Sequence, residues 1–153
     1  MTADPDALAA LHRHLQSIFD SDLETYHATT TEDLTLYEWF VTPHRIDGIP
    51  FHDFMMTEAA RPDTTGQALD PSAGAGGEKP RTRYDLANLR GQQYGDTVIF
   101  SYTMLLSQGT SAGVRVRSYN ESRVLIKFTD GWKIVHVHKS PSYSTPLDPP
   151  TQK

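Results

Sequence analysis

Apolar residues near the start of the chain recur every three or four positions, which is the spacing of one face of an α-helix. The apolar stripe consists of Leu8, Leu11, Leu15, Ile18 and Phe19. Asp4 can cap the amino end of such a helix, and Pro5 suits its first position. The pattern therefore predicts a first helix over residues 5–20.

Two shorter helices and one strand are predicted next. Asp22 can cap a second helix over residues 22–28, and the polar run 29–33 predicts a turn. The β-branched and aromatic run 34–40 predicts a strand. After a loop that contains two prolines and a glycine, apolar positions recur again and predict a third helix over residues 50–60.

The second half of the chain has the alternating pattern that is typical of strands. Four strands are predicted, over residues 83–92, 97–106, 114–128 and 132–140. Asp130-Gly131 is a hairpin signal between the last two strands. Helices followed by antiparallel strands indicate an α+β fold, in which the helices cover one face of a bent sheet.

Two segments lack the apolar residues that a core needs. Residues 61–82 contain many Gly and Pro, and we expect a flexible loop insertion there. Residues 141–153 are rich in Pro and predict an extended or disordered tail. The sequence therefore predicts a single domain over residues 1–140.

The composition of the 153 residues excludes several classes of site. The chain has no Cys, which excludes disulfides, thiolate metal sites and a Cys nucleophile. Its net charge of -5 argues against nucleic-acid binding through phosphates. The mean hydropathy is -0.50, and no apolar run approaches the ~20 residues of a membrane span. We expect a cytoplasmic protein without nucleic-acid or membrane partners.

Several short motifs at specific spacings resemble a known family. They are LeuThrLeuTyrGlu at 34–38, AspGly at 47–48, PheHisAspPhe at 51–54, GluSerArgVal at 121–124, Trp132, and ValHisValHisLysSer at 135–140. Together they resemble the association (hub) domain of calcium/calmodulin-dependent protein kinase II, a member of the NTF2-like (SnoaL-like) superfamily. The resemblance implies a cone, in which a curved antiparallel sheet wraps around the N-terminal helices. It also implies a homodimer, or a higher oligomer, formed through the sheets. No kinase motif accompanies it.

The resemblance also implies a ligand site. In the kinase hub a small carboxylate is held by a Tyr, a His and three Arg. The first three of these fall on Tyr26, His52 and Arg123, and the remaining two Arg positions are occupied by Lys139 and Met104. Lys cannot form the bidentate fork of Arg, so we expect Arg123 to contribute more than Lys139. Two cations, a hydroxyl and an imidazole favour a small organic anion, and Met104 favours a ligand with a larger apolar part.

Two other interpretations of these residues remain open. Arg123 can form a structural ion pair with Glu38 or Glu121. If protein carboxylates neutralise both Arg123 and Lys139, a purely structural assembly unit is favoured. Glu38 is a candidate general base in a SnoaL or ketosteroid-isomerase type of enzyme that transfers a proton on a carbonyl compound. That chemistry needs an electrophilic partner, and His14 and Phe19 occupy the helix region where related isomerases carry it.

His136 and His138 alternate on one predicted strand and should point to the same face. Two His side chains can start a zinc site, but no third ligand lies at a motif-like spacing. Hydrogen-bonded structural histidines are the favoured interpretation. We therefore expect no metal and no cofactor, and a function in self-association and anion binding rather than catalysis.

Overall fold

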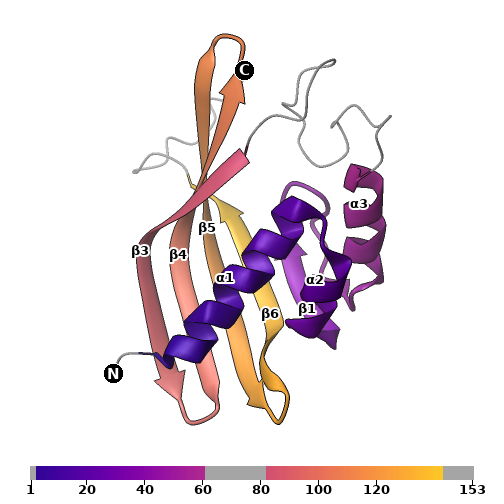
Figure 1. Cartoon of the computed structure of the whole chain (residues 1–153), viewed down its shortest axis with the longest axis vertical. Coiled ribbons are helices and arrows are strands. Elements are labelled where there is room, and N and C mark those ends of the chain that lie inside the picture. Colours follow the sequence, from indigo (N-terminus) through magenta and orange to yellow (C-terminus); the bar gives the residue numbers. More distant parts are fainter. Residues whose placement is uncertain (1–2, 61–81, 143–153) are drawn as a thin grey trace, which may run out of the picture.

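The computed structural model describes residues 3–60 and 82–142, which form three helices and one six-stranded sheet (Figure 1). The elements are α1 (Pro5–Asp20), α2 (Leu23–Ala28), β1 (Thr30–Glu38), β2 (Ile46–Asp47), α3 (Pro50–Ala60), β3 (Thr82–Tyr94), β4 (Thr97–Thr110), β5 (Gly113–Phe128) and β6 (Gly131–Pro141). The predicted α+β class is therefore confirmed.

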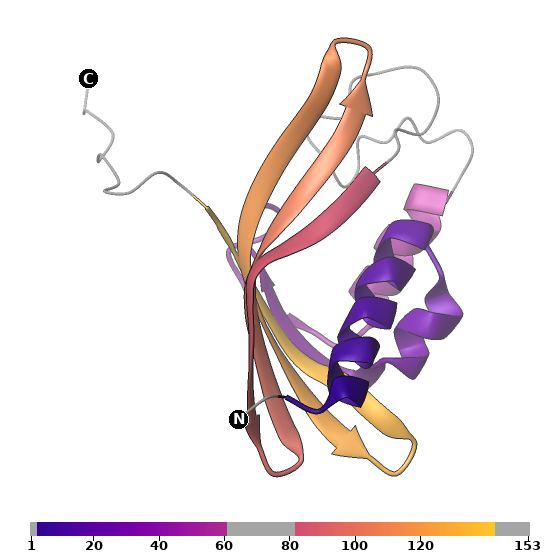
Figure 2. The same cartoon turned by 60° about the vertical axis from the view of Figure 1, so that its left-hand side comes forward.

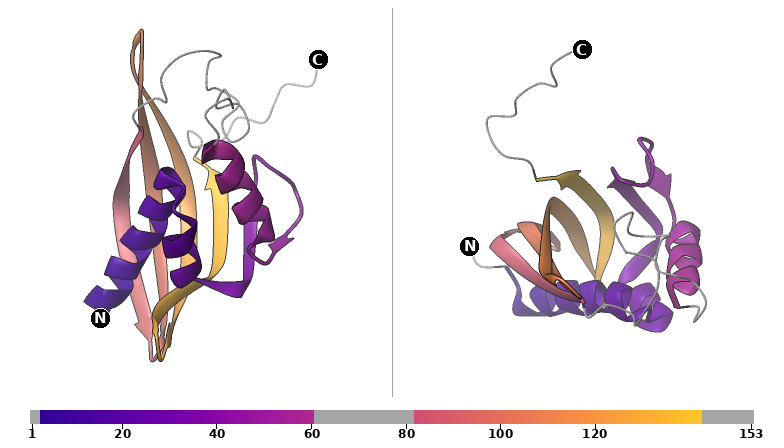
Figure 3. Two further views of the ribbon diagram at one scale, coloured as in Figure 1. Left: turned by 45° about the vertical axis from the view of Figure 1, so that its right-hand side comes forward. Right: turned by 90° about the horizontal axis from the view of Figure 1, so that it is seen from above.

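The strands are arranged in the order β2-β1-β6-β5-β4-β3. The β3, β4, β5 and β6 strands form an antiparallel meander, whereas β1 joins β6 in parallel. The sheet curves strongly, and all three helices lie on its concave side (Figure 2). Seen from above, the strands form an open arc whose open side is crossed by α1 (Figure 3). This is the predicted cone.

Helix α1 follows its sequence pattern closely. The Asp4 side chain accepts a hydrogen bond from the backbone N–H of Asp6 at 2.9 Å, and Ser21 ends the helix in the left-handed region with a φ of 56°. The apolar stripe buries Leu11 and Leu15 against the sheet. Within residues 3–60 and 82–142, no helix is both long enough and apolar enough to cross a membrane.

The first strand differs from its prediction. We expected a turn over residues 29–33 and a strand over 34–40, but β1 begins at Thr30 and ends at Glu38. Long-range pairing is the reason, because Thr30 lies opposite Ile134 of β6 and the backbone N–H of Ile134 donates to the Thr29 carbonyl at 2.8 Å. The predicted loop before α3 contains the short strand β2, which pairs with β1.

The remaining boundaries also differ from the predictions by a few residues. The predicted strands 97–106 and 114–128 both extend toward their hairpin turn, and this end of β4 and β5 projects beyond the rest of the sheet (Figure 1). Thr82 already belongs to β3 and Pro141 still belongs to β6. The rest of the predicted loop insertion (61–81), and residues 143–153 of the predicted tail, lie outside the described residues.

Alternation along the strands separates two faces of the sheet. Val98, Phe100, Tyr102 and Met104 of β4 point toward the helices and are all buried. Arg123 lies opposite Phe100 and therefore shares this concave face. The core thus consists of apolar side chains, with a small number of charged groups placed among them.

Replacing Gly91 with alanine should lower the free energy of unfolding by about 1–3 kcal/mol. Gly91 lies opposite Phe100, and a Cβ atom there would lie 2.6 Å from the Ala3 Cβ atom and 2.8 Å from the Phe100 Cε1 atom. Urea unfolding of the variant measures the loss. Gly109→Ala on β4 is the matched control, because nothing lies within 4 Å of a Cβ atom at that position. Equal stabilities of the two variants would contradict the packing argument.

Candidate functional site

Four charged side chains lie on the concave face of three neighbouring strands. Arg123 and Glu121 come from β5, Lys139 from β6 and Glu38 from β1. In the register of the sheet, Lys139 lies between Glu121 on one side and Glu38 on the other. Arg123, Glu121 and Glu38 are at most 5% exposed. Charges that are buried this deeply require partners, and each of them has one.

Arg123 is held by partners from three elements. Its Nη2 atom lies 3.1 Å from Oε2 of Glu121, and its Nε atom donates to the Tyr102 hydroxyl at 2.8 Å. The Tyr102 hydroxyl in turn donates to the same Glu121 oxygen at 2.9 Å. Burial alone would lower the pKa of Arg123, but Tyr102 and Glu121 raise it above its ordinary value. Arg123 is therefore permanently charged and locked in place.

His14 of α1 is the third partner of Arg123. The Arg123 Nη1 atom and the His14 Nε2 atom are 2.8 Å apart, and because a guanidinium can only donate, Nε2 must accept. The proton of the neutral ring is therefore on Nδ1, which lies 3.1 Å from the Thr30 hydroxyl. Burial and the charge of Arg123 hold the pKa of His14 well below its ordinary value.

The second ion pair joins Lys139 to Glu38. The Lys139 Nζ atom lies 2.5 Å from Oε1 of Glu38, and His52 Nε2 lies 3.4 Å from Oε2 of Glu38. The other ring nitrogen of His52 contacts the Tyr26 hydroxyl. Burial alone would raise the pKa of Glu38, but Lys139 and His52 hold it well below its ordinary value. Glu38 therefore remains an ionised carboxylate.

The two ion pairs belong to one cluster but differ in their exposure. The rings of His14 and Tyr26 are 5.0 Å apart between centroids and connect the two halves. The side chains of Arg123 and Glu121 are 2% and 4% exposed, whereas those of Lys139 and His52 are 14% and 13% exposed. The Lys139 half of the cluster is thus more exposed to solvent than the Arg123 half.

Aromatic side chains surround the more exposed half. Phe40 lies 5.9 Å, centroid to Nζ, from Lys139. The Phe40, Trp39 and Tyr119 rings lie 5.6–6.3 Å apart between centroids. Trp39 and Phe40 are 42% and 37% exposed. We call Trp39, Phe40 and Tyr119 the aromatic rim. It adds apolar surface next to a cation.

The structure brings together most of the residues that the sequence predicted. Tyr26, His52, Lys139 and Arg123 all belong to the cluster, together with Glu38. Met104 is buried in the core, opposite Tyr119 on the same face. Of the two partners that we considered for Arg123, the structure shows Glu121. Glu38 pairs with Lys139 instead.

Sequence reasoning missed the roles of His14 and Tyr102. His14 does carry a signal, because it lies between Leu11 and Leu15 on the buried side of α1, where a polar residue needs a partner. Tyr102 alternates with apolar residues in β4 and looks like an ordinary core position. Neither pattern identifies Arg123 as the partner.

His136 and His138 lie on the opposite, convex face of the sheet. His136 Nδ1 is hydrogen-bonded to the Thr35 hydroxyl at 2.8 Å, and the His138 ring lies 5.3 Å from that of Tyr37. His136 is therefore hydrogen-bonded, as the sequence analysis expected for both histidines. Within the part of the chain that the structure describes, no group of three or more His, Asp or Glu side chains could hold a metal ion.

Comparisons with known proteins agree with this architecture. The profile of the calcium/calmodulin dependent protein kinase II association domain matches residues 4–67 and 75–143. None of the curated protein sequences matches the chain.

Solved structures share the fold. The CaMKII hub homology domain of Chlamydomonas reinhardtii is 23% identical with a TM-score of 0.73, and the alignment covers 90% of this chain and 97% of that domain. The CaMKII hub of S. rosetta is 22% identical with a TM-score of 0.70, covering 93% and 100%. An NTF2-like superfamily protein of Salmonella enterica is 18% identical with a TM-score of 0.62, covering 91% and 90%. The fold is that of the NTF2-like superfamily.

Acidification should destabilise the protein through His14. In the unfolded chain His14 takes up a proton near its ordinary pKa of 6.5, whereas in the folded protein it stays neutral. The contribution of His14 to the free energy of unfolding is therefore fully present above pH 6.5 and is lost as the pH falls below this value. The loss is at most about 1.4 kcal/mol per pH unit. Urea unfolding from about pH 8 to about pH 5 should give a steeper slope for the wild type than for His14→Gln. Parallel slopes would contradict this assignment.

Proposed function

The chain belongs to the calcium/calmodulin-dependent protein kinase II association-domain family, and we propose that it is an assembly module whose copies associate through the convex face of the sheet. The observation that carries this proposal is the composition and register of that face. No described helix covers it, because α1, α2 and α3 all lie on the concave side (Figure 2).

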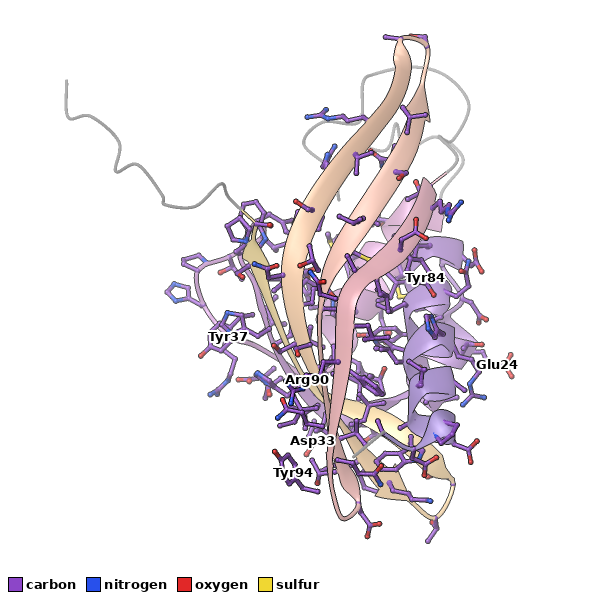
Figure 4. The ribbon with its side chains drawn as sticks, turned by 90° about the vertical axis from the view of Figure 1, so that its left-hand side faces the viewer. Glu24, Asp33, Tyr37, Tyr84, Arg90 and Tyr94 are labelled. Atoms are coloured by element: carbon purple, nitrogen blue, oxygen red, sulfur yellow. The ribbon has the colours of Figure 1, made fainter. Side chains whose placement is uncertain are left out.

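A continuous row of side chains crosses the convex face. In the register of the sheet, Tyr37, His138, Ser122, Ser101 and Arg90 are direct neighbours on five successive strands. Figure 4 shows Tyr37 and Arg90 on the side of the sheet that faces away from the helices. The two serines in the middle are short and let another surface approach the sheet closely. The larger Tyr37 and Arg90 at the ends are residue types that are enriched at interfaces.

The same face contains a shallow depression of about 310 Å³. Hydroxyl, amide and imidazole side chains line it, among them Thr103, Asn120 and His138. Such groups can hydrogen-bond to a second copy directly or through water, as is common in protein interfaces. The face is therefore suited to a second protein surface, and a second copy is the partner that the family implies.

Introducing a charge at the centre of the convex face should break the assembly. In Ser122→Glu, a larger, charged side chain would be buried between two copies, which is unfavourable. We expect the wild type to be at least a dimer and the variant to be a monomer of about 17 kDa by light scattering. Gln16→Lys on the exposed side of α1 is the control, because it introduces a charge next to Asp20, to which Gln16 already donates, and it should retain the wild-type mass. A monomeric wild type would refute the proposal.

A second candidate function is binding of a small organic anion in the cone. The observation that favours it is that His52 and Lys139, in the more exposed half of the cluster, both contact Glu38, while Tyr26 contacts His52. Arg123 is hydrogen-bonded to Glu121, Tyr102 and His14, so we assign it a structural role beneath the ligand site rather than direct contact with the ligand. Because the Lys139 ammonium group already pairs with the Glu38 carboxylate, the carboxylate of a ligand has to replace Glu38 as the partner of Lys139.

The geometry gives less support to proton-transfer catalysis by Glu38. A general base works best when its pKa is near the working pH, whereas that of Glu38 is held well below its ordinary value. Lys139 and His52 also occupy the two carboxylate oxygens. Binding is therefore the better-supported use of these residues.

Lys139→Met should weaken the binding of any carboxylate compound that stabilises the wild type. A charge-assisted hydrogen bond contributes about 1.5–3 kcal/mol, so the dissociation constant should rise at least about tenfold. Calorimetry with a panel of small carboxylates, with and without an ammonium group, measures the effect. Lys133→Met is the control, because Lys133 is on the same strand but pairs with Asp130 at 2.7 Å. Unchanged binding by Lys139→Met would contradict the ligand site.

A further inference from the structure

The charges of the two ion pairs in the cone balance one another. Arg123 and Lys139 carry two positive charges, and Glu38 and Glu121 carry two negative charges. His14 adds none, because it is neutral. A simple monoanion that binds Lys139 would displace Glu38, whose side chain is only 7% exposed, and would separate its carboxylate from the Lys139 ammonium group, with His52 still 3.4 Å away. A buried charge that loses its partner opposes binding.

A ligand with both charges avoids this difficulty. Its carboxylate replaces Glu38 at Lys139, while its ammonium group replaces Lys139 at Glu38, so that both buried side chains keep a partner of opposite charge. We propose that the Glu38–Lys139 pair is the recognition site for a zwitterion of the α-amino acid type. This inference rests on the proposed ligand site and defines the class of molecule that it binds.

The two ion pairs differ in how readily they can open. Lys139 has one hydrogen bond to Glu38, through a single Nζ atom on a flexible stem. Arg123 uses Nε, Nη1 and Nη2 on three partners, and all of these groups are buried. Among the described residues, the pair that a ligand would open is therefore the one held by fewer hydrogen bonds and more exposed to solvent. Opening it leaves the Arg123 network intact.

His52 and Tyr26 can hold Glu38 while the pair is open. The Glu38 Oε2 atom lies 3.4 Å from His52 Nε2, and the other ring nitrogen of His52 contacts Tyr26. Only Oε1 of Glu38 changes its partner from Lys139 to the ligand ammonium. The carboxylate therefore remains in one place and presents a fixed acceptor.

The aromatic rim indicates what the rest of the ligand should be. Phe40 lies directly next to the Lys139 ammonium, and Trp39 and Tyr119 extend the apolar surface outward. Because Trp39 and Phe40 are 42% and 37% exposed, a ligand side chain that covers them removes apolar surface from water. We therefore expect an amino acid with an aromatic or large aliphatic side chain.

Three compounds that carry the same benzyl side chain test the proposal. Phenylalanine has both charges, hydrocinnamate has only the carboxylate, and phenethylamine has only the ammonium group. Thermal shift and calorimetry on the full chain should show phenylalanine binding at least about tenfold more tightly than either analogue. Norleucine, hexanoate and pentylamine repeat the comparison with a butyl side chain. If neither amino acid stabilises the protein, the proposal is overturned.

Glu38→Gln is the decisive variant, because it should shift the ligand preference from the amino acid toward the simple carboxylate. Without the carboxylate, the ligand ammonium loses its partner and Lys139 becomes available to a simple anion. The variant should therefore bind hydrocinnamate more tightly than the wild type does, and phenylalanine more weakly. Glu24→Gln on the outer side of α2 (Figure 4) should keep the wild-type profile. A Glu38→Gln variant that retains the wild-type preference would contradict the proposal.

The outcomes separate this inference from the functions on which it rests. If hydrocinnamate binds the wild type as tightly as phenylalanine, the zwitterion proposal is wrong but the anion site stands. If no compound binds the wild type or Glu38→Gln, the ligand site and the inference both fall. Light scattering of the same samples tests association through the convex face independently, since Ser122 is on the other side of the sheet.

Discussion

The buried guanidinium of Arg123 is the interaction on which the rest of the structure depends. It is charged, it is 2% exposed, and it is hydrogen-bonded to β4 through Tyr102, to β5 through Glu121 and to α1 through His14. Such a charge is tolerated inside an apolar cone only while these partners are present. The position of α1 against the curved sheet is therefore fixed by hydrogen bonding as well as by packing. Losing Arg123 would also leave Glu121 buried without a cation.

The contrast between Arg and Lys distinguishes the two ion pairs of the cone. The planar guanidinium of Arg123 satisfies several acceptors at once and loses little freedom in doing so. The Lys139 ammonium is a point charge on a flexible chain, and its bond to Glu38 is closer to solvent. Where the family resemblance implies an arginine, this chain therefore has a single ammonium group, which pairs with Glu38.

The sequence predicts local structure better than it predicts partners. The stripe from Leu8 to Phe19 and the cap at Asp4 are local, and they locate α1 correctly. Residues 30–33 are polar and therefore predict a turn. They form a strand instead, because Thr30 pairs with Ile134, which lies about a hundred positions away in the sequence. The bond between His14 and Arg123 likewise spans 109 positions. The resemblance identified most residues of the cluster, but only the fold shows that Arg123 and Lys139 are already paired with the carboxylates of Glu121 and Glu38.

Adjacent residues of β5 point alternately to the two faces of the sheet. Glu121 and Arg123 point into the cone, and Ser122 between them points to the convex face. Association through the convex face would therefore restrain the same backbone that carries the Arg123 network. Lys139 and His138 repeat this arrangement on β6, one facing the cone and the other the convex row. Because the two faces share strands but no side chains, a substitution can disrupt one surface and leave the chemistry of the other unchanged. Any effect of assembly on ligand binding must then pass through the backbone of β5 and β6.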